Sequence, residues 1–275
     1  MIRDDDAMRP HRTDRRARSQ PLRRGLPGLL FLAALILFWQ IAGSASGFAD
    51  VLLPPPSRIA VALLRAAVQP SFWTDTAVTL VRFSAGFAVG CMAGIGAGVL
   101  MGLSRTAHDT LVLAVELLRP MPATALIPLA ILFLGLANAM VIAIVAWAVT
   151  FPVLINTLDG VRGVDPVLVD TGRVFGFRGG ELARHVILPA SLPQIVTGMR
   201  VALAIGLVLV IVVEMLIGNQ GLGHRVIDAE RTFRFEEMYA TIGWIGGVGY
   251  IVNGLFLLVR GRVLRWYVAS RARVI

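Results

Sequence analysis

The chain has 275 residues, a mean hydropathy of +0.75 and only 16% charged residues, whereas soluble domains carry roughly a quarter. Because the apolar residues also gather into long runs, a soluble protein is excluded and a polytopic membrane protein is predicted. The net charge of +9 rests on 26 arginines without one lysine, which excludes a P-loop ATPase, since the phosphate loop requires a lysine.

Six apolar runs are long enough to cross a membrane, whose hydrocarbon takes about 20 residues to span. We predict spans over residues 26–42, 78–101, 111–135, 139–157, 195–217 and 239–259. The first is interpreted as an uncleaved anchor rather than a signal peptide, because its polar leader is long. Pro120 and Pro122 interrupt the third, whose alternative start is near Met121. The predicted fold class is all-α, a polytopic membrane protein with about six transmembrane helices.

The arginines are distributed unevenly about these spans and predict the orientation. With the N-terminus in the cytoplasm, the inner segments hold nineteen arginines and the outer segments five. We therefore expect both termini and the segment 158–194 to be cytoplasmic. The predicted domains are a cytoplasmic Arg-rich tail over 1–25, a transmembrane domain over 26–263 and a cytoplasmic tail over 264–275.

The first outer segment predicts a short amphipathic helix that lies on the membrane surface. Ser57 is its expected cap. One face of the helix is formed by Ile59, Leu63, Ala66 and Ala67.

The second span carries a glycine at every fourth position: Gly86, Gly90, Gly94, Gly98 and Gly102. Such a stripe lets a neighbouring backbone approach closely, so we interpret it as a helix-packing surface, with pore lining as the alternative. Pro128 in the third span and Pro152 in the fourth are expected to bend their helices, because each removes a backbone donor.

Glu214 is the one acid clearly inside a predicted span. It lies three residues from the outer end, about 5 Å from the interface at a rise of ~1.5 Å per residue. Two interpretations stay open: it lines a translocation vestibule, or it is a satisfied residue at the interface. Arg200, near the inner end of the same span, is interpreted as a structural residue that reaches the headgroups.

The cytoplasmic segment 158–194 predicts a helical hairpin. Asp165 and Pro166 form a helix start, and Gly176 fits the position just after its end. The apolar face of this first helix consists of Val167, Leu168, Thr171, Val174 and Phe175. A second short helix is expected from Gly180 to Ile187, where Pro189 stops it. Its polar face meets either water or a partner protein.

The spacing of this hairpin is D-T-G-x₃-G-x₉-V-x-L-P, from Asp170 to Pro189. It resembles the EAA loop, E-A-A-x₃-G-x₉-I-x-L-P, of the permease subunits of binding-protein-dependent ABC importers. The chain is also similar to the nitrate, sulfonate and taurine branch of these MetI-like type I importers, over most of residues 50–267. The matching stretches are LLPPPSRI, RFSAGFAVG, LLRPMPATALIPLAILFLGL, FPVLINTLDGV, LPASLPQIVTGMRVAL and EMLIGNQGLGHRVIDA.

The resemblance implies that 26–263 is a permease domain whose loop docks on a cytoplasmic ATPase. By position, the ATPase contacts are Asp170, Thr171, Gly172 and Gly176, and Leu188 with Pro189 fixes the return into the fifth span. The sequence departs from the family at D-T-G, because Gly172 lowers helix propensity by roughly 1 kcal/mol relative to Ala. The implied partners are two cytoplasmic ABC ATPase subunits, an external solute-binding protein and a second copy of the chain, in the bacterial inner membrane.

No cofactor is expected on this chain, since ATP and Mg²⁺ would bind the partner ATPase. No catalytic or metal site is expected either, because Cys91 lies in an apolar run and the four histidines are widely separated. Nucleic-acid binding is not expected, since the arginines flank apolar runs. The expected function is the pathway for a small anionic solute resembling a sulfonate, nitrate or taurine. The alternatives are an ATPase-independent secondary transporter and, third, a membrane-embedded enzyme.

Overall fold

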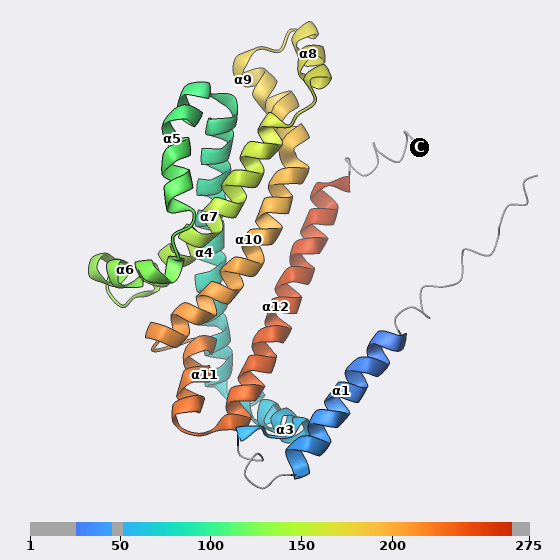
Figure 1. The fold of residues 1–275 in the computed structure, drawn as a ribbon, viewed down its shortest axis with the longest axis vertical. Coiled ribbons are helices and arrows are strands. Elements are labelled where there is room, and N and C mark those ends of the chain that lie inside the picture. The colour runs from blue at the N-terminus through green and yellow to red at the C-terminus, as the bar shows by residue number, and fades with distance from the viewer. Residues whose placement is uncertain (1–25, 46–51, 266–275) are drawn as a thin grey trace, which may run out of the picture. The chain divides into compact units, whose positions relative to one another are not determined.

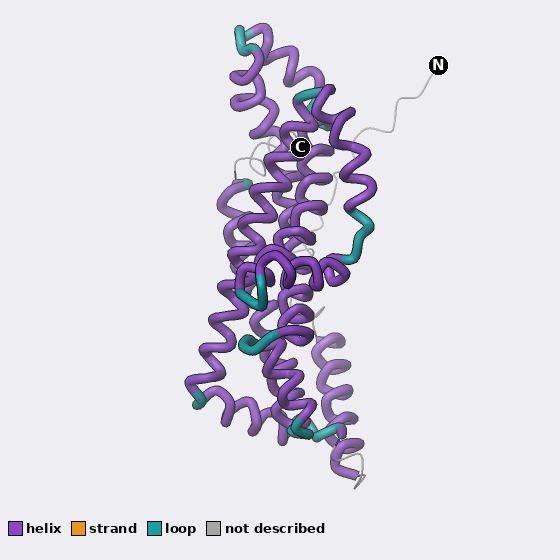
Figure 2. The backbone as a smooth tube through the Cα atoms, turned by 90° about the vertical axis from the view of Figure 1, so that its left-hand side faces the viewer, coloured by secondary structure: helices purple, strands orange, loops and turns teal. Residues whose placement is uncertain are grey.

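A computed structural model describes residues 26–45 and 52–265, and every regular element among them is a helix (Figures 1 and 2). The all-α prediction is therefore confirmed. The predicted tail 1–25 and nearly all of the predicted tail 264–275 lie outside the described residues. The chain divides into two compact units at Arg58 and Ile59.

The first unit contains helix α1 (Leu26–Ala45) and the beginning of α3 (Pro56–Ala67). Gln40 joins them, because its Nε2 donates to Ser57 Oγ and its Oε1 accepts from the Ser57 backbone N–H, both at 3.1 Å. The prediction that Ser57 caps α3 is wrong, since the helix begins at Pro56 and the Ser57 hydroxyl binds Gln40 instead. Helix α1 has 20 residues and contains the first predicted span, 26–42.

The second unit contains four helices that are long and apolar enough to cross a membrane. They contain the second, fourth, fifth and sixth predicted spans and are α4 (Pro70–Leu103), α7 (Asn138–Arg162), the continuous segment Gly179–Ile217 and α12 (Phe235–Val263). In α12 only Ala240, Thr241 and Val248 are buried, so this apolar helix packs less closely on the described residues than α4, α7 and α10 do.

The third predicted span is broken. Helix α5 (Arg105–Leu118) is followed by a 3₁₀ turn, η1 (Ala123–Leu126), and by α6 (Ile127–Leu134), and the two parts meet at 91°. The predicted span 111–135 is therefore a bent pair of helices, and the break lies at Pro120 and Pro122, the prolines predicted to interrupt it. Pro128 does not bend a helix as predicted, because it lies in the first turn of α6, where proline is tolerated.

The core of the second unit is the contact of α4 with α7, on which α10 (Leu188–Ile217) packs. The five glycines of the α4 stripe pack against branched side chains that recur at every fourth position of α7, and all but Gly102 are buried. The pairs are Gly86 with Val145, Gly90 with Val149, Gly94 with Val153, Gly98 with Thr157, and Gly102 with Val161. Both series ascend together, so the helices run parallel. These contacts assign the stripe to helix packing.

The segment before α10 differs from the prediction. Helix α9 (Gly179–Leu182) continues through a π-helical turn, η2 (Ala183–Ile187), directly into α10. Pro189 therefore does not stop the helix. The wider π turn accommodates the proline, because the Leu188 N–H bonds to the Ala183 carbonyl, one residue further back than in an α-helix.

Candidate functional site

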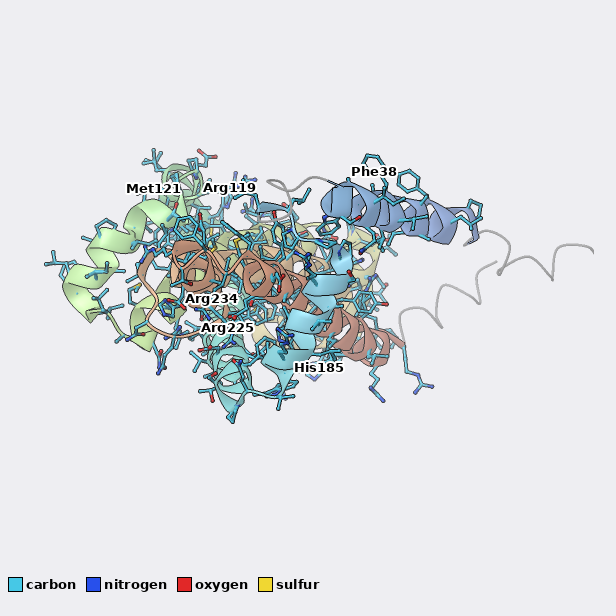
Figure 3. All side chains as sticks on the ribbon, turned by 90° about the horizontal axis from the view of Figure 1, so that it is seen from below. Phe38, Arg119, Met121, His185, Arg225 and Arg234 are labelled. Atoms are coloured by element: carbon cyan, nitrogen blue, oxygen red, sulfur yellow. The ribbon has the colours of Figure 1, made fainter. Side chains whose placement is uncertain are left out.

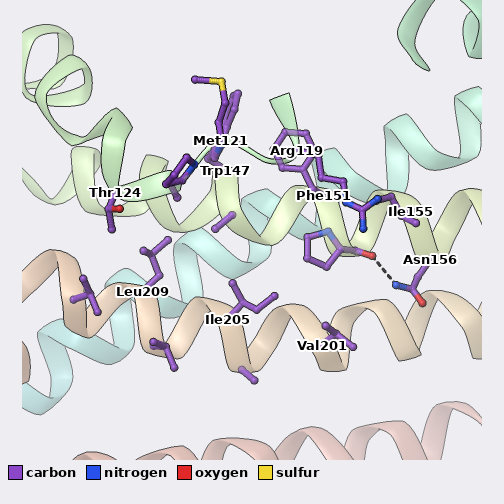
Figure 4. Close-up of a pocket in the computed structure, with 17 residues that line it drawn as sticks. Arg119, Met121, Thr124, Trp147, Phe151, Ile155, Asn156, Val201, Ile205 and Leu209 are labelled. Carbon is purple, nitrogen blue, oxygen red and sulfur yellow. Dashed lines mark hydrogen bonds between the residues drawn. The ribbon is translucent and has the colours of Figure 1, made fainter. Parts of the chain in front are cut away.

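A cleft of about 910 Å³ opens between the middle of α7 and the middle of α10 (Figure 4). Its α7 wall carries Trp147 and Phe151, whose rings meet edge to face with centroids 5.2 Å apart. The opposite wall is aliphatic and contains Val201, Ile205 and Leu209 of α10. This size is typical of small-molecule sites.

The break between α5 and η1 closes one side of the cleft and contributes two of its polar side chains. Arg119 follows the last residue of α5, and Met121 and Thr124 lie beyond it. On α7, Asn156 lies near Arg119 in Figure 4 and donates from Nδ2 to the Pro152 carbonyl at 2.9 Å. The sequence patterns did not single out Arg119, Trp147 or Asn156. The paired prolines at the break were the available signal.

Glu214 does not line this cleft. Its side chain is fully buried and forms an ion pair with Arg82 of α4, with Oε1 2.9 Å from Nη1. Its other oxygen accepts from Thr79 Oγ1 at 2.8 Å and from the Gly223 backbone N–H at 3.1 Å. Of the two interpretations left open, the vestibule is therefore not supported, and the satisfied residue agrees with the structure.

The same cluster fixes the loop between α10 and helix α11 (Leu222–Arg231). Arg82 donates to the Gln220 carbonyl at 2.8 Å and from Nε to Asn138 Oδ1 at 2.8 Å, which joins α4, α7 and the loop. Gly221 has a φ of +110°, and a Cβ there would overlap the Glu214 carboxylate. Only glycine fits at this point of the loop, because a side chain would occupy the position of the acid.

Asp75 of α4 secures the next turn of the loop. Its carboxylate accepts from the Gly221 N–H at 3.1 Å and from Arg225 Nη1 at 3.4 Å. Arg225 also donates to Gln69 at 2.8 Å. Figure 3 looks at the molecule from this end and labels Arg225 and Arg234. Hydrogen bonds and an ion pair therefore attach the first turn of α11 and the residue before it to the beginning of α4.

At the opposite end of the second unit, α8 (Pro166–Val174) and α9 form the predicted hairpin (Figure 1). Asp165 caps α8 by accepting the Val167 N–H at 2.9 Å. Gly176 has a φ of +91° and ends the helix in a Schellman motif, in which its N–H bonds to the Arg173 carbonyl and the Phe177 N–H to the Gly172 carbonyl. The predicted start and end of this helix are confirmed.

The residues singled out in this hairpin occupy different environments. Asp170 and Thr171 are exposed, and Asp170 pairs with Arg173 at 2.9 Å. Gly172 is buried, and a Cβ there would lie 2.8 Å from Leu182 Cδ1, so this residue faces the interior of the hairpin. Leu188 and Pro189 are half-buried in the first turn of α10.

The apolar face of α8 is the exposed one. Val174 is 86% exposed and Phe175 78%, and Val167 and Leu168 are also exposed. Exposure of a contiguous apolar face to water is unfavourable, so such faces mark interaction surfaces.

Comparison with known proteins identifies the chain. Residues 90–268 match the family of binding-protein-dependent transport system inner membrane components. The chain belongs to this family. It is therefore a multi-pass membrane protein of the MetI-like ABC importer permeases, a family of translocation subunits.

Relatives with assigned transport roles match nearly the whole permease. The putative aliphatic sulfonates transport permease protein of Bacillus subtilis is 30% identical over 241 residues, 88% of this permease and 87% of the relative. The taurine transport system permease protein of Escherichia coli is 29% identical, over 86% of this permease and 88% of the relative. The nitrate import permease protein of a Synechocystis strain is 26% identical, over 85% and 87%.

The fold also has a solved counterpart. A chain of the inward-facing MetNI methionine ABC transporter superimposes with a TM-score of 0.60 at 17% identity, over 71% of this permease and 98% of that chain. At this identity the likeness concerns the fold alone.

Proposed function

We propose that this permease forms the membrane pathway of an ATP-driven importer and works as a pair of copies with two cytoplasmic ABC ATPases and an external solute-binding protein. ATP and Mg²⁺ bind the ATPases, and this chain holds no cofactor. Both termini and the α8–α9 hairpin lie in the cytoplasm of a bacterial cell. The relatives named for aliphatic sulfonates, taurine and nitrate favour a small anionic solute.

The observation that carries this proposal is the exposed apolar face of α8, a helix that is capped at both ends. The caps at Asp165 and Gly176 fix the helix, so the face is presented in one orientation. In a family of transport subunits, an ATPase groove is the partner that such a face fits. Asp170 and Thr171 lie exposed on the same helix and contribute polar contacts to the dock.

The test places a charge on this face without disturbing the packing of the hairpin. Val174→Asp should lower recovery of the co-expressed ATPase subunit at least tenfold, because it removes an apolar contact and buries a carboxylate at the interface. Val68→Asp is the matched control, since Val68 is 83% exposed and follows α3, outside the hairpin. Recovery is measured by affinity purification in detergent.

Equal recovery with Val174→Asp and with the unchanged chain would overturn the docking assignment. Solute uptake separates the importer from an ATPase-independent transporter. The importer should lose uptake together with ATPase binding, whereas a secondary transporter would keep it.

A further inference from the structure

Arg119 is a cationic side chain at the edge of a membrane-spanning core. It stands at the break where α5 ends, and the cleft that it lines is bounded by the middle segments of α7 and α10. Helix α5 has 14 residues, which place Arg119 about 21 Å from the start of that helix at 1.5 Å per residue. The break therefore stands a full helix length from the α5 start, and the Arg119 side chain is exposed where it lines the cleft.

The guanidinium has no ion-pair or hydrogen-bond partner among the described residues. Glu116 lines an adjoining hollow with Arg119 and Ile155 but does not pair with it. A charged side chain within a membrane segment normally faces a partner or a water-filled cavity, and an unpaired one indicates a functional site.

The surroundings of Arg119 suit an anion at one end and an apolar group at the other. The Asn156 side chain donates one N–H to the Pro152 carbonyl, and its second N–H has no partner among the described residues. Beyond these two donors, the cleft is walled by Trp147 and Phe151 and by the aliphatic side chains of α10. A planar guanidinium presents paired donors that match the oxygens of an oxyanion.

We propose that Arg119 and Asn156 form the anion-binding end of this cleft, and that the transported solute is a small organic oxyanion of the sulfonate or carboxylate class. Its charged group meets Arg119, and its apolar part lies against Trp147 and Phe151. This proposal rests on the proposed function, because it makes the cleft a part of the translocation pathway.

The first test measures the electrostatic field of the cleft with the full chain in lipid nanodiscs. The background variant Cys91→Ala removes the single native cysteine, and Ala204→Cys introduces a thiol on the α10 wall of the cleft. The thiol is modified with a methanethiosulfonate that carries a sulfonate and with one that carries a trimethylammonium group. Arg119→Gln should lower the ratio of the anionic to the cationic rate roughly tenfold, because the positive charge that is lost acts on the two reagents with opposite sign.

Arg119→Lys should restore most of this ratio. A thiol at Val174→Cys, on the exposed hairpin, should show no dependence on Arg119. An unchanged ratio in Arg119→Gln would overturn the proposal. It would also be overturned if neither reagent reached Ala204→Cys while both modified Val174→Cys, since the cleft would then face lipid.

The second test concerns the class of solute. Propane-1-sulfonate should slow modification of Ala204→Cys by the cationic reagent in the unchanged cleft, and this protection should fall about tenfold with Arg119→Gln or Asn156→Ala. Equal protection by tetramethylammonium would overturn the anion assignment, and equal protection by nitrate would overturn the organic class. Neither readout involves the ATPase, so its failure is distinguishable from failure of the hairpin dock.

Discussion

Arg82 and Glu214 illustrate how a membrane helix carries charge. Burying either charged side chain alone among apolar neighbours would cost free energy. Here the two side chains form an ion pair, and both carboxylate oxygens of Glu214 accept hydrogen bonds. The arrangement is sensitive to the loss of one partner, because the other then stays buried and unpaired.

Arg82→Met should lower the free energy of unfolding by about 3–5 kcal/mol, since it leaves the Glu214 carboxylate uncompensated. Adding Glu214→Met should recover much of this loss. The measurement is thermal unfolding in detergent, with Arg173→Met as control. That arginine and its partner Asp170 are 63% and 69% exposed, so its loss should cost about 1 kcal/mol or less. A loss no larger for Arg82→Met than for Arg173→Met would contradict the account.

Phe233 stands where a glycine is usual. The turn after α11 is a second Schellman motif, in which the Arg234 N–H bonds to the Ala229 carbonyl and the Phe233 N–H to the Glu230 carbonyl. Phe233 therefore adopts a φ of +57°, the left-handed region, while its ring is 77% exposed. Ion pairs from Arg234 to Asp228 and Glu237, both at 2.7 Å, hold the turn in place.

Phe233→Gly should be more stable than Phe233→Ala by about 1 kcal/mol, because both variants lose the ring but only glycine adopts this φ without strain. Gly176→Ala places alanine at the corresponding position of the other Schellman motif and should destabilise the permease by a similar amount. Chemical unfolding in detergent compares the three variants. The strain would be refuted by a Phe233→Ala variant as stable as Phe233→Gly.

At the scale of elements, α4 and α7 pack by matching glycines to branched residues at the same spacing. A Cβ added to Gly94 would lie 2.6 Å from the Thr150 carbonyl oxygen and 2.8 Å from Val153 Cβ. Two residues further on, Gly96 has nothing within 4 Å of such a Cβ. The two glycines therefore have opposite roles in one helix.

Gly94→Ala should destabilise the permease by about 1–3 kcal/mol, because backbone lies in the way of the new methyl group and the helices must separate. Gly96→Ala, the matched control, should stabilise it by up to about 1 kcal/mol through helix propensity. The thermal midpoints of the two variants, followed by size-exclusion chromatography after heating, should move in opposite directions. A shift of the same sign and size in both would remove the packing role from Gly94.

The hairpin shows why D-T-G departs from E-A-A in this chain. Leu182 and Val186 approach the backbone of α8 so closely that a methyl group at Gly172 would lie within 3 Å of each. Glycine has a lower helix propensity than alanine, but its lack of a side chain lets α8 pack tightly on the following helix. The departure is thus a feature of the hairpin interior, whereas Asp170 and Thr171 occupy its surface.

At the scale of the second unit, three features occupy different places along its helices. Polar bonds hold α4, α7, α10 and the loop before α11 together at one end, and an exposed apolar helix stands at the other. Between them lies the cleft, at a break that leaves α5 and α6 at 91°. A fixed end and a cleft beside a broken helix are an arrangement suited to movement around a site.

The sequence by itself determined the helical class, four of the spans, the packing stripe and both ends of α8. Each of these follows from local rules, because span length, glycine spacing and caps depend on neighbours in the chain. The positions of Arg82 and Glu214 in the sequence also carry information about their pairing. Arg82 lies near the start of the second predicted span and Glu214 near the end of the fifth, so both lie near the predicted outer face of the membrane. At this depth a charged side chain requires a partner.

Only the tertiary structure decided that Glu214 is a buried partner of Arg82, that Gly172 faces inward, and that Arg119 lines a cleft. Each of these facts depends on contacts between residues distant in the chain, such as the 132 positions that separate Arg82 from Glu214. Periodicity gives the face of a helix on which a residue lies, but the packing of other helices decides whether that face meets protein, lipid or an open cleft.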